Sequence, residues 1–187
     1  MIAIIDYGVG NLFSAEKAFV ALGADVRVTS DESTIREASK IVLPGVGAFG
    51  DCMKNLEESG LIPVLKESVA AGKPLLAECG GMMALFESMT GVDGDESPLA
   101  GLLPGKVVMQ KRLAGLGMQE VVLPEGVLRG HAFHYSRAET ALEPLCITTR
   151  ADGRAGEAVY RRQRLTASYM HLYFPSNPEA VAHLFSR

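Results

Sequence analysis

The sequence predicts an α/β protein with a largely parallel sheet covered by helices and antiparallel strands added in the second half. Between residues 1 and 78, short apolar runs typical of buried strands alternate with stretches of helical length and period. Strand, helix and strand in succession is the pattern of a parallel sheet covered by helices. From about residue 106 the apolar runs are short, partly alternating and separated by turn residues, which indicates antiparallel or mixed strands.

In the first half, four strands are expected, near residues 1–5, 26–29, 41–43 and 74–78. The stretches between them predict helices at residues 12–23, 33–39, 51–60 and 61–72. Gly23 closes the first helix, because glycine tolerates the left-handed backbone that ends many helices. Either Asp31 or Ser33 caps the second helix, since both side chains accept hydrogen bonds from free backbone N–H groups.

In the second half, the apolar runs predict strands at residues 106–110, 119–123, 131–136, 145–150, 157–162 and 165–171. A last helix is expected at residues 177–186, with Asn177 as its cap and Pro178 in its first turn. The sequence contains no internal repeat, no low-complexity tract and no linker rich in proline or serine. We therefore expect residues 1–187 to form a single domain.

Composition limits the functions to consider. The chain is 48% hydrophobic and 21% charged, with a net charge of −4, so no strong field for nucleic acid or anionic membranes is expected. No apolar run reaches the roughly 18 residues of a membrane-spanning helix. Cys52, Cys79 and Cys146 have neither an even count nor the spacing of metal ligands. Free thiols in a reducing cytoplasm are therefore expected, together with no metal and no cofactor.

Residues 74–85, with the sequence PLLAECGGMMAL, place a cysteine directly after an apolar strand and before two glycines. In an open parallel sheet, ligands bind at the carboxyl ends of the strands, where Cys79 would lie. Gly80 and Gly81 permit a tight turn into a helix. The N-terminus of that helix would favour a thiolate, and its free N–H groups could bind an oxyanion. A packed core cysteine beside a turn is the alternative, and the local pattern leaves both open.

A thiolate nucleophile needs a base, and His171 is the best candidate because it ends the apolar run 165–171 at the same sheet edge. His131 and His134 are expected on one face of their strand. No further cysteine or carboxylate stands at ligand spacing beside them, so structural roles are favoured over a metal site. His183 falls in the last amphipathic helix, as a surface or packing residue.

Together, these motifs resemble a class I glutamine amidotransferase domain over nearly the whole chain. Residues 1 to about 75, with IIDYGVGNLFS and IVLPGVGAFGDCMKNL, are similar to the glutaminase subunit of imidazole glycerol phosphate synthase. Residues 76–187, with AECGGMM, LRGHAFHYS and LTASYMHLYFPSNPEAVAHLF, resemble the glutaminase domain of cobyrinic acid a,c-diamide synthase. The resemblance implies a flavodoxin-like three-layer fold, and its two parts suggest a chimera of half-domains, more readily engineered than natural.

The resemblance implies that Cys79 attacks the side-chain amide of L-glutamine, while His171 activates the thiol and protonates the leaving amine. Gly80 N–H and an N–H from the Val46–Gly47 stretch would form the oxyanion hole. The turn DYGVGNLFS resembles the region through which the histidine-pathway glutaminase meets its cyclase. Asn11 and Ser14 are therefore either partner contacts or helix-capping residues, and both roles stay open.

Two departures from the family pattern affect the expected activity. Most class I amidotransferases carry a glutamate two residues after the histidine, where this chain has Tyr173. No Walker-type GxxxxGK[ST] motif occurs, so this chain cannot activate a carboxylate with ATP and would release ammonia to water or to an unidentified synthase. We expect weak glutaminase activity; the alternative is a chimeric scaffold that folds without catalysis.

Overall fold

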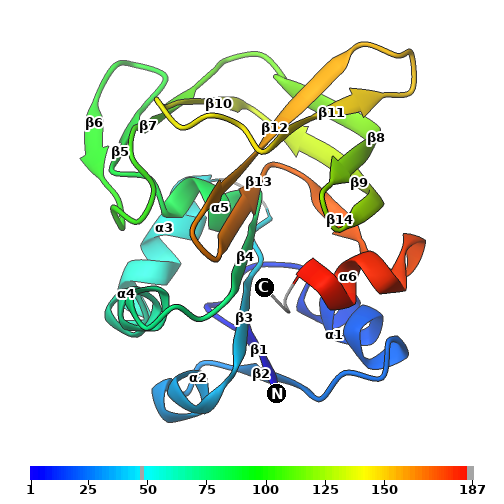
Figure 1. The fold of residues 1–187 in the computed structure, drawn as a ribbon. Helices are drawn as coiled ribbons and strands as arrows, with labels where there is room; N and C mark the ends of the chain where they lie inside the picture. The colour runs from blue at the N-terminus through cyan, green and yellow to red at the C-terminus, as the bar shows by residue number, and fades with distance from the viewer. Residues whose placement is uncertain (47–48, 185–187) are drawn as a thin grey trace.

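The computed structural model describes residues 1–46 and 49–184 (Figure 1). The four strands predicted in the first half are present as β1 (Ile2–Ile5), β2 (Val26–Thr29), β3 (Lys40–Leu43) and β4 (Leu75–Glu78). They pair in parallel in the order β2-β1-β3-β4, and β13 (Leu165–Ser168) continues the parallel part beside β4. All four residues of β1 and of β4 are buried, which explains their continuous apolar sequences.

The predicted helices connect these strands as α1 (Leu12–Ala21), α2 (Glu32–Glu37), α3 (Phe49–Glu58) and α4 (Ile62–Ala70). Gly23 follows α1 at a φ of +73°, as its role in closing the helix requires. Asp31, rather than Ser33, caps α2, because its carboxylate accepts the Thr34 N–H at 2.8 Å. The last helix, α6 (Pro178–Leu184), follows the 3-10 turn η1 (Phe174–Ser176), and Asn177 caps it through the Ala180 N–H at 3.0 Å. Residues 185–186 of that predicted helix lie outside the described residues.

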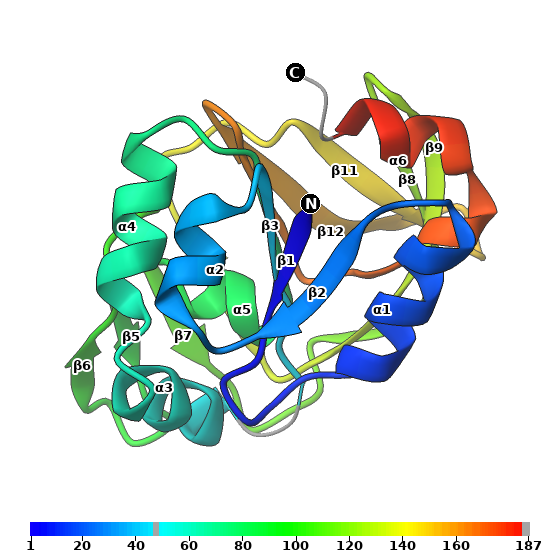
Figure 2. The ribbon, with the colours of Figure 1, turned by 90° about the horizontal axis from the view of Figure 1, so that it is seen from below.

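Helices cover both faces of the main sheet, as Figure 2 shows, with α2, α3, α4 and α5 (Gly80–Ala84) on one side and α1 and α6 on the other. Each face has its own apolar cluster. Ile5, Phe86 and Leu165 belong to the cluster on the first face, and Phe19 and Val121 belong to the cluster on the second. Both clusters combine residues from before and after position 75. The predicted three-layer α/β architecture is confirmed.

The second half extends the sheet with antiparallel strands. These are β8 (Gly115–Leu123), β9 (Gly126–His134), β11 (Cys146–Arg150), β12 (Ala155–Arg162) and β14 (His171–Tyr173). Within the described residues, the resulting ten-stranded sheet has the order β14-β9-β8-β11-β12-β13-β4-β3-β1-β2. The edge strand β14 therefore reaches the sheet through β9, far from β4 in the order of strands.

Two expectations for the second half need correction. Residues from 106 onward do not all extend the main sheet, because β7 (Lys106–Met109) and β10 (Ser136–Glu139) form a second sheet with β5 (Ser88–Thr90) and β6 (Glu96–Pro98). The strands β5 and β6 have three residues each and too little apolar sequence to be predicted. Residues 165–171 are not one strand: β13 ends at Ser168, and His171 begins β14 instead of ending its predecessor.

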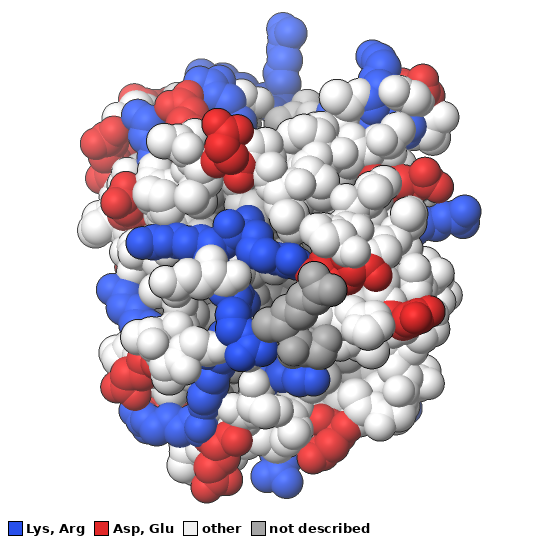
Figure 3. Space-filling view, viewed as in Figure 1, with Lys and Arg blue, Asp and Glu red and all other residues white. Residues whose placement is uncertain are grey.

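Lys and Arg side chains gather across the middle of one face of the molecule, with Asp and Glu side chains beside them (Figure 3). The basic run at residues 160–164 contributes side chains that bind other parts of the protein. Arg161 forms an ion pair with Glu125 at 2.6 Å, and Arg162 donates to the carbonyl oxygen of Leu102 at 2.8 Å. These arginines therefore fasten the β12–β13 hairpin. No described helix combines the length and apolar character needed to cross a membrane.

Candidate active site

Cys79 lies between β4 and α5 and is 5% exposed. Its φ is +45°, a backbone conformation that a residue with a side chain adopts at a cost of about 1–3 kcal/mol. The surrounding sheet holds this turn, because the Cys79 N–H donates to the Ser168 carbonyl of β13 at 2.8 Å. A strained strand-to-helix turn of this kind presents a nucleophile at the edge of a sheet in hydrolases.

The glycines around the turn permit close contact between two loops. A Cβ on Gly45 would lie 2.2 Å from the Gly81 backbone nitrogen, and a Cβ on Gly81 would lie 2.2 Å from the Leu43 carbonyl oxygen. Both distances are impossible for real side chains. Gly45, in the PGVG loop that follows β3, therefore packs directly onto the backbone of the cysteine turn.

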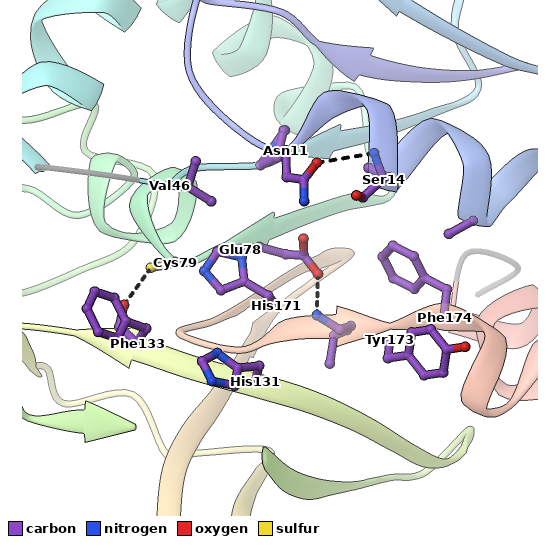
Figure 4. Close-up of a pocket in the computed structure, with 14 residues that line it drawn as sticks. Asn11, Ser14, Val46, Glu78, Cys79, His131, Phe133, His171, Tyr173 and Phe174 are labelled. Atoms are coloured by element: carbon purple, nitrogen blue, oxygen red, sulfur yellow. Dashed lines mark hydrogen bonds between the residues drawn. The ribbon is translucent and has the colours of Figure 1, made fainter. Parts of the chain in front are cut away.

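A cavity of about 520 Å³ opens beside the cysteine (Figure 4). Its lining includes Glu78, Cys79, His131, Phe133, His171 and Tyr173. The sequence placed Cys79 and His171 at one sheet edge, and the structure brings both to this cavity. The two described side chains form no hydrogen bond with each other. The Cys79 thiol instead donates to the Phe133 carbonyl oxygen of β9 at 3.8 Å.

The protonation of the thiol differs from the sequence prediction. Burial raises the pKa of Cys79 to about 12, although the Gly80 N–H lowers it in part. The expectation that the following helix favours the thiolate assumed a helix dipole at the sulfur. Because α5 has only five residues, its dipole is small, and the loss of solvent around a charged thiolate dominates. Thiolate formation at neutral pH therefore needs a proton acceptor.

His171 can be that acceptor, because its imidazole is held in the neutral form. Burial lowers the pKa of His171, and the nearby imidazoles of His131 and His134 lower it further. A neutral imidazole in the same cavity as a protonated thiol is the starting state for general-base activation.

The predicted oxyanion hole is only partly available in this structure. The Gly80 N–H, next to the nucleophile, donates to the Gly45 carbonyl oxygen at 3.3 Å. An incoming oxyanion would have to replace that bond. Val46 is half-buried and lines the cavity, and its carbonyl oxygen accepts from the Cys52 thiol at 3.4 Å. Gly47 lies outside the described residues.

Two side chains at the site were not found from the sequence. Glu78 is 6% exposed, and its Oε1 accepts the Leu172 N–H at 2.9 Å. Burial raises the pKa of Glu78 to about 7. The available signal was a charged residue closing a buried apolar run. The Tyr7 hydroxyl donates to the Pro44 carbonyl oxygen at 2.6 Å and so supports the PGVG loop from the end of β1, which no sequence pattern indicated.

The remaining histidines occupy different environments. The expectation that His131 and His134 share one face is wrong, because residues three apart on a strand point to opposite faces. His131 is exposed at the cavity, whereas His134 is buried and paired with Glu157. His183 is exposed on α6, 4.0 Å from Glu179. Among the described residues, no three His, Cys, Asp or Glu side chains group as metal ligands.

Asn11 and Ser14 lie at the mouth of the cavity, Asn11 directly before α1 and Ser14 in its first turn. Asn11 is the helix cap, since its Oδ1 accepts the Ser14 N–H at 3.3 Å. Both residues are exposed, and both line the cavity. The capping role is therefore present for Asn11 but not for Ser14, whose N–H is the one that is capped, and a contact of either residue with a partner remains a prediction.

Comparisons with known proteins agree with this geometry. Residues 2–179 match the family described as CobB/CobQ-like glutamine amidotransferase domain. The hydrogenobyrinate a,c-diamide synthase of Pseudomonas aeruginosa is 56% identical over 118 residues, which are 63% of this chain and 27% of that protein. Imidazole glycerol phosphate synthase subunit HisH of Sulfurimonas denitrificans is 46% identical over 108 residues, 58% of this chain and 51% of that protein.

The chain thus spans between about a quarter and a half of the length of these curated relatives. A crystal structure of a glutamine amidotransferase superposes with a TM-score of 0.74 at 18% identity, covering 98% of this chain and 97% of the other. This likeness supports the fold. Relatives of both predicted kinds occur, while the family match runs through position 75. The fusion of two half-domains stays a prediction.

Proposed function

We propose that this chain, which belongs to the CobB/CobQ-like glutamine amidotransferase domain family, hydrolyses L-glutamine to glutamate and ammonia. The observation that carries the proposal is the strained Cys79, which lines the same cavity as a neutral His171. Family membership alone does not assign a reaction to particular side chains. The assignment to Cys79 and His171 rests on this geometry.

In the proposed reaction, the Cys79 thiol transfers its proton to His171, and the sulfur attacks the δ-carbon of glutamine. The imidazolium then gives the proton to the departing nitrogen, so that ammonia leaves and a glutamyl thioester remains. Water attacks the thioester, His171 accepts a proton from that water and returns one to the sulfur, and glutamate leaves. Gly80 N–H and the Val46–Gly47 backbone would stabilise the oxyanion in both steps, each donor contributing about 3–4 kcal/mol.

Turnover by this chain alone should be slow for two structural reasons. The buried thiol has a pKa of about 12, so only a very small fraction of it is deprotonated at neutral pH. The Gly80 N–H is engaged with the Gly45 carbonyl oxygen and becomes available only when that 3.3 Å bond opens. A partner or the substrate would remove these two obstacles to catalysis by rearranging the cysteine turn.

An ammonia-accepting synthase is the partner that this chemistry calls for, since ammonia released to water is lost. Asn11 and Ser14, exposed at the mouth of the cavity, are proposed contacts for it. The hydrogenobyrinate a,c-diamide synthase of Pseudomonas aeruginosa is much longer than this chain, since the 118 matched residues are 27% of it, so the accepting activity would belong to other sequence. Three free cysteines support a reducing cytoplasm as the working compartment.

The direct test measures glutamate and ammonia released from L-glutamine by the wild-type chain and by Cys79→Ala. We expect slow release by the wild type, at a rate proportional to protein concentration, and none above background from the variant. Equal rates for both proteins would contradict the proposal. In that case the folded but catalytically silent scaffold is the correct description.

A further inference from the structure

His171 lacks the orienting group that most class I amidotransferases use. Tyr173 stands at the corresponding position and is 57% exposed. In the described part of the chain, no hydrogen bond joins the Tyr173 hydroxyl to the His171 imidazole. An imidazole that rotates freely spends little time aligned for proton transfer, and a misplacement of about 1 Å costs on the order of a hundredfold in rate. Some other group must hold His171 if the site is to work.

The strand that carries His171 is held from both sides. On one side, β14 pairs with β9, with His171 opposite His131 and Leu172 opposite Gly130. The other side of β14 is the edge of the ten-stranded sheet, where a backbone N–H has no strand to bind. There Glu78 Oε1 accepts the Leu172 N–H at 2.9 Å, the contact drawn as a dashed line in Figure 4.

Glu78 is a charged residue at the end of the buried strand β4, where an apolar residue would be expected unless the carboxyl has a function. Within the described part of the chain, no cationic side chain forms an ion pair with its carboxyl, although the residue is only 6% exposed. Burying an ionised carboxyl without a counter-ion is costly, and such groups gather at functional sites. Glu78 also lines the cavity together with its neighbour Cys79 and with His171.

We propose that Glu78 is the positioning residue for His171: its carboxyl binds the Leu172 N–H and thereby fixes the backbone that carries the imidazole. The proposal rests on the glutaminase reaction proposed above. It connects the two halves of the site through one side chain, because Glu78 directly precedes the nucleophile and binds the residue that follows the base. A shift of the cysteine turn would then move the base with it.

The test compares Glu78→Ala, Glu78→Gln and the wild type, with Glu57→Gln as control, since Glu57 is exposed on α3. Alanine removes the acceptor, whereas glutamine keeps an amide oxygen that can still bind the Leu172 N–H. Losing a hydrogen bond to a charged group corresponds to about a tenfold to a hundredfold effect. We therefore expect kcat to fall by that factor in Glu78→Ala with KM within about twofold, and to recover at least partly in Glu78→Gln. Glu57→Gln should match the wild type.

A second measurement reads the geometry without turnover. In isotope-labelled protein, the Leu172 amide proton and the His171 ring resonances should shift in Glu78→Ala and return towards their wild-type positions in Glu78→Gln. Unchanged resonances, or a kcat in folded Glu78→Ala within about twofold of the wild type, would overturn the positioning role. If the wild type releases no glutamate at all, the proposed function fails, and the resonances alone decide the role of Glu78.

Discussion

The His134 Nε2 atom lies 3.1 Å from Glu157 Oε2, and both side chains are largely buried. On the other side of the ring, His134 Nδ1 lies 2.9 Å from the Ser136 carbonyl oxygen, which can only accept, so Nδ1 carries a hydrogen. The ring also stacks on Tyr169 at 3.8 Å. The pair thus anchors the strand whose Phe133 carbonyl contacts the nucleophile.

Glu157→Gln should destabilise the fold. Glu157 lies beside His134 and also forms an ion pair with Arg150 at 3.7 Å, so removing its charge leaves a buried polar contact unsatisfied, with a loss of about 1–3 kcal/mol in the free energy of unfolding. Denaturant titration measures this. Glu58→Gln is a suitable control, because Glu58 forms an exposed contact with Lys54 at 3.9 Å and should change stability by less than about 0.5 kcal/mol. Equal losses in the two variants would mean that the buried pair is not held as described.

Glu78→Gln should stabilise the protein above pH 7 while slowing catalysis. Burial raises the pKa of Glu78 from 4.5 to about 7 in the folded chain. Between these values the folded chain keeps a proton that the unfolded chain has released, so the wild type loses stability as pH rises. Above pH 7 the full loss, roughly 3 kcal/mol, is present, and a neutral glutamine avoids it.

The measurement is the free energy of unfolding of Glu78→Gln and wild type at pH 4.5 and at pH 8. We expect the variant to exceed the wild type at pH 8 and the difference to disappear near pH 4.5. A difference that is equal at both pH values would show that the carboxyl titrates normally. Such a gain in stability at the expense of activity is common for residues kept for function.

Gly45→Ala should damage both the fold and the site. A Cβ at this position would lie 2.2 Å from the Gly81 nitrogen, so the PGVG loop must move away from the cysteine turn. We expect a loss of about 1–3 kcal/mol in stability and no measurable glutamine hydrolysis. Gly50→Ala, on α3 with open space around it, should instead gain about 0.5–1 kcal/mol. Wild-type activity in Gly45→Ala would contradict the close contact of the loops.

The first half of the fold was predictable because its signals are local. The apolar runs of β1 and β4 are buried on both faces, and the residues that close the following helices have defined backbone roles, as Gly23 does. The second sheet was not predictable, since the three-residue strand β5 is held only by its pairing with β6 on one side and β7 on the other. The sequence placed His171 at the correct edge of the sheet but in the wrong strand. The chain bends after Ser168, and no residue in the apolar run 165–171 indicates that bend.

At the site, residue types indicated the chemistry but not its energetics. The Cys79 turn followed from a strand, a cysteine and two glycines in succession. The pKa of its thiol depends on how many atoms exclude water from the sulfur, which only tertiary packing determines. Glu78 went unrecognised for the same reason: its partner, Leu172, lies 94 positions away in the chain.

The reactivity of the three thiols should depend on the reagent. With a simple alkylating agent such as iodoacetamide, we expect Cys146 to react first, because it is half-buried whereas Cys52 and Cys79 are buried and Cys79 has a pKa of about 12. An electrophilic glutamine analogue should reverse the order. Bound in the cavity, it places its reactive carbon near Cys79 while His171 takes the proton, which compensates for the raised pKa.

Mass spectrometry after brief labelling identifies the modified thiol. L-Glutamine in excess should protect Cys79 from the analogue and leave the iodoacetamide reaction of Cys146 unchanged. His171→Asn should lower the Cys79 labelling rate without affecting Cys146, since only the thiol in the cavity uses the imidazole as a base. If both reagents modify Cys146 first, or if glutamine gives no protection, Cys79 is a packed core thiol and its assignment as nucleophile is incorrect.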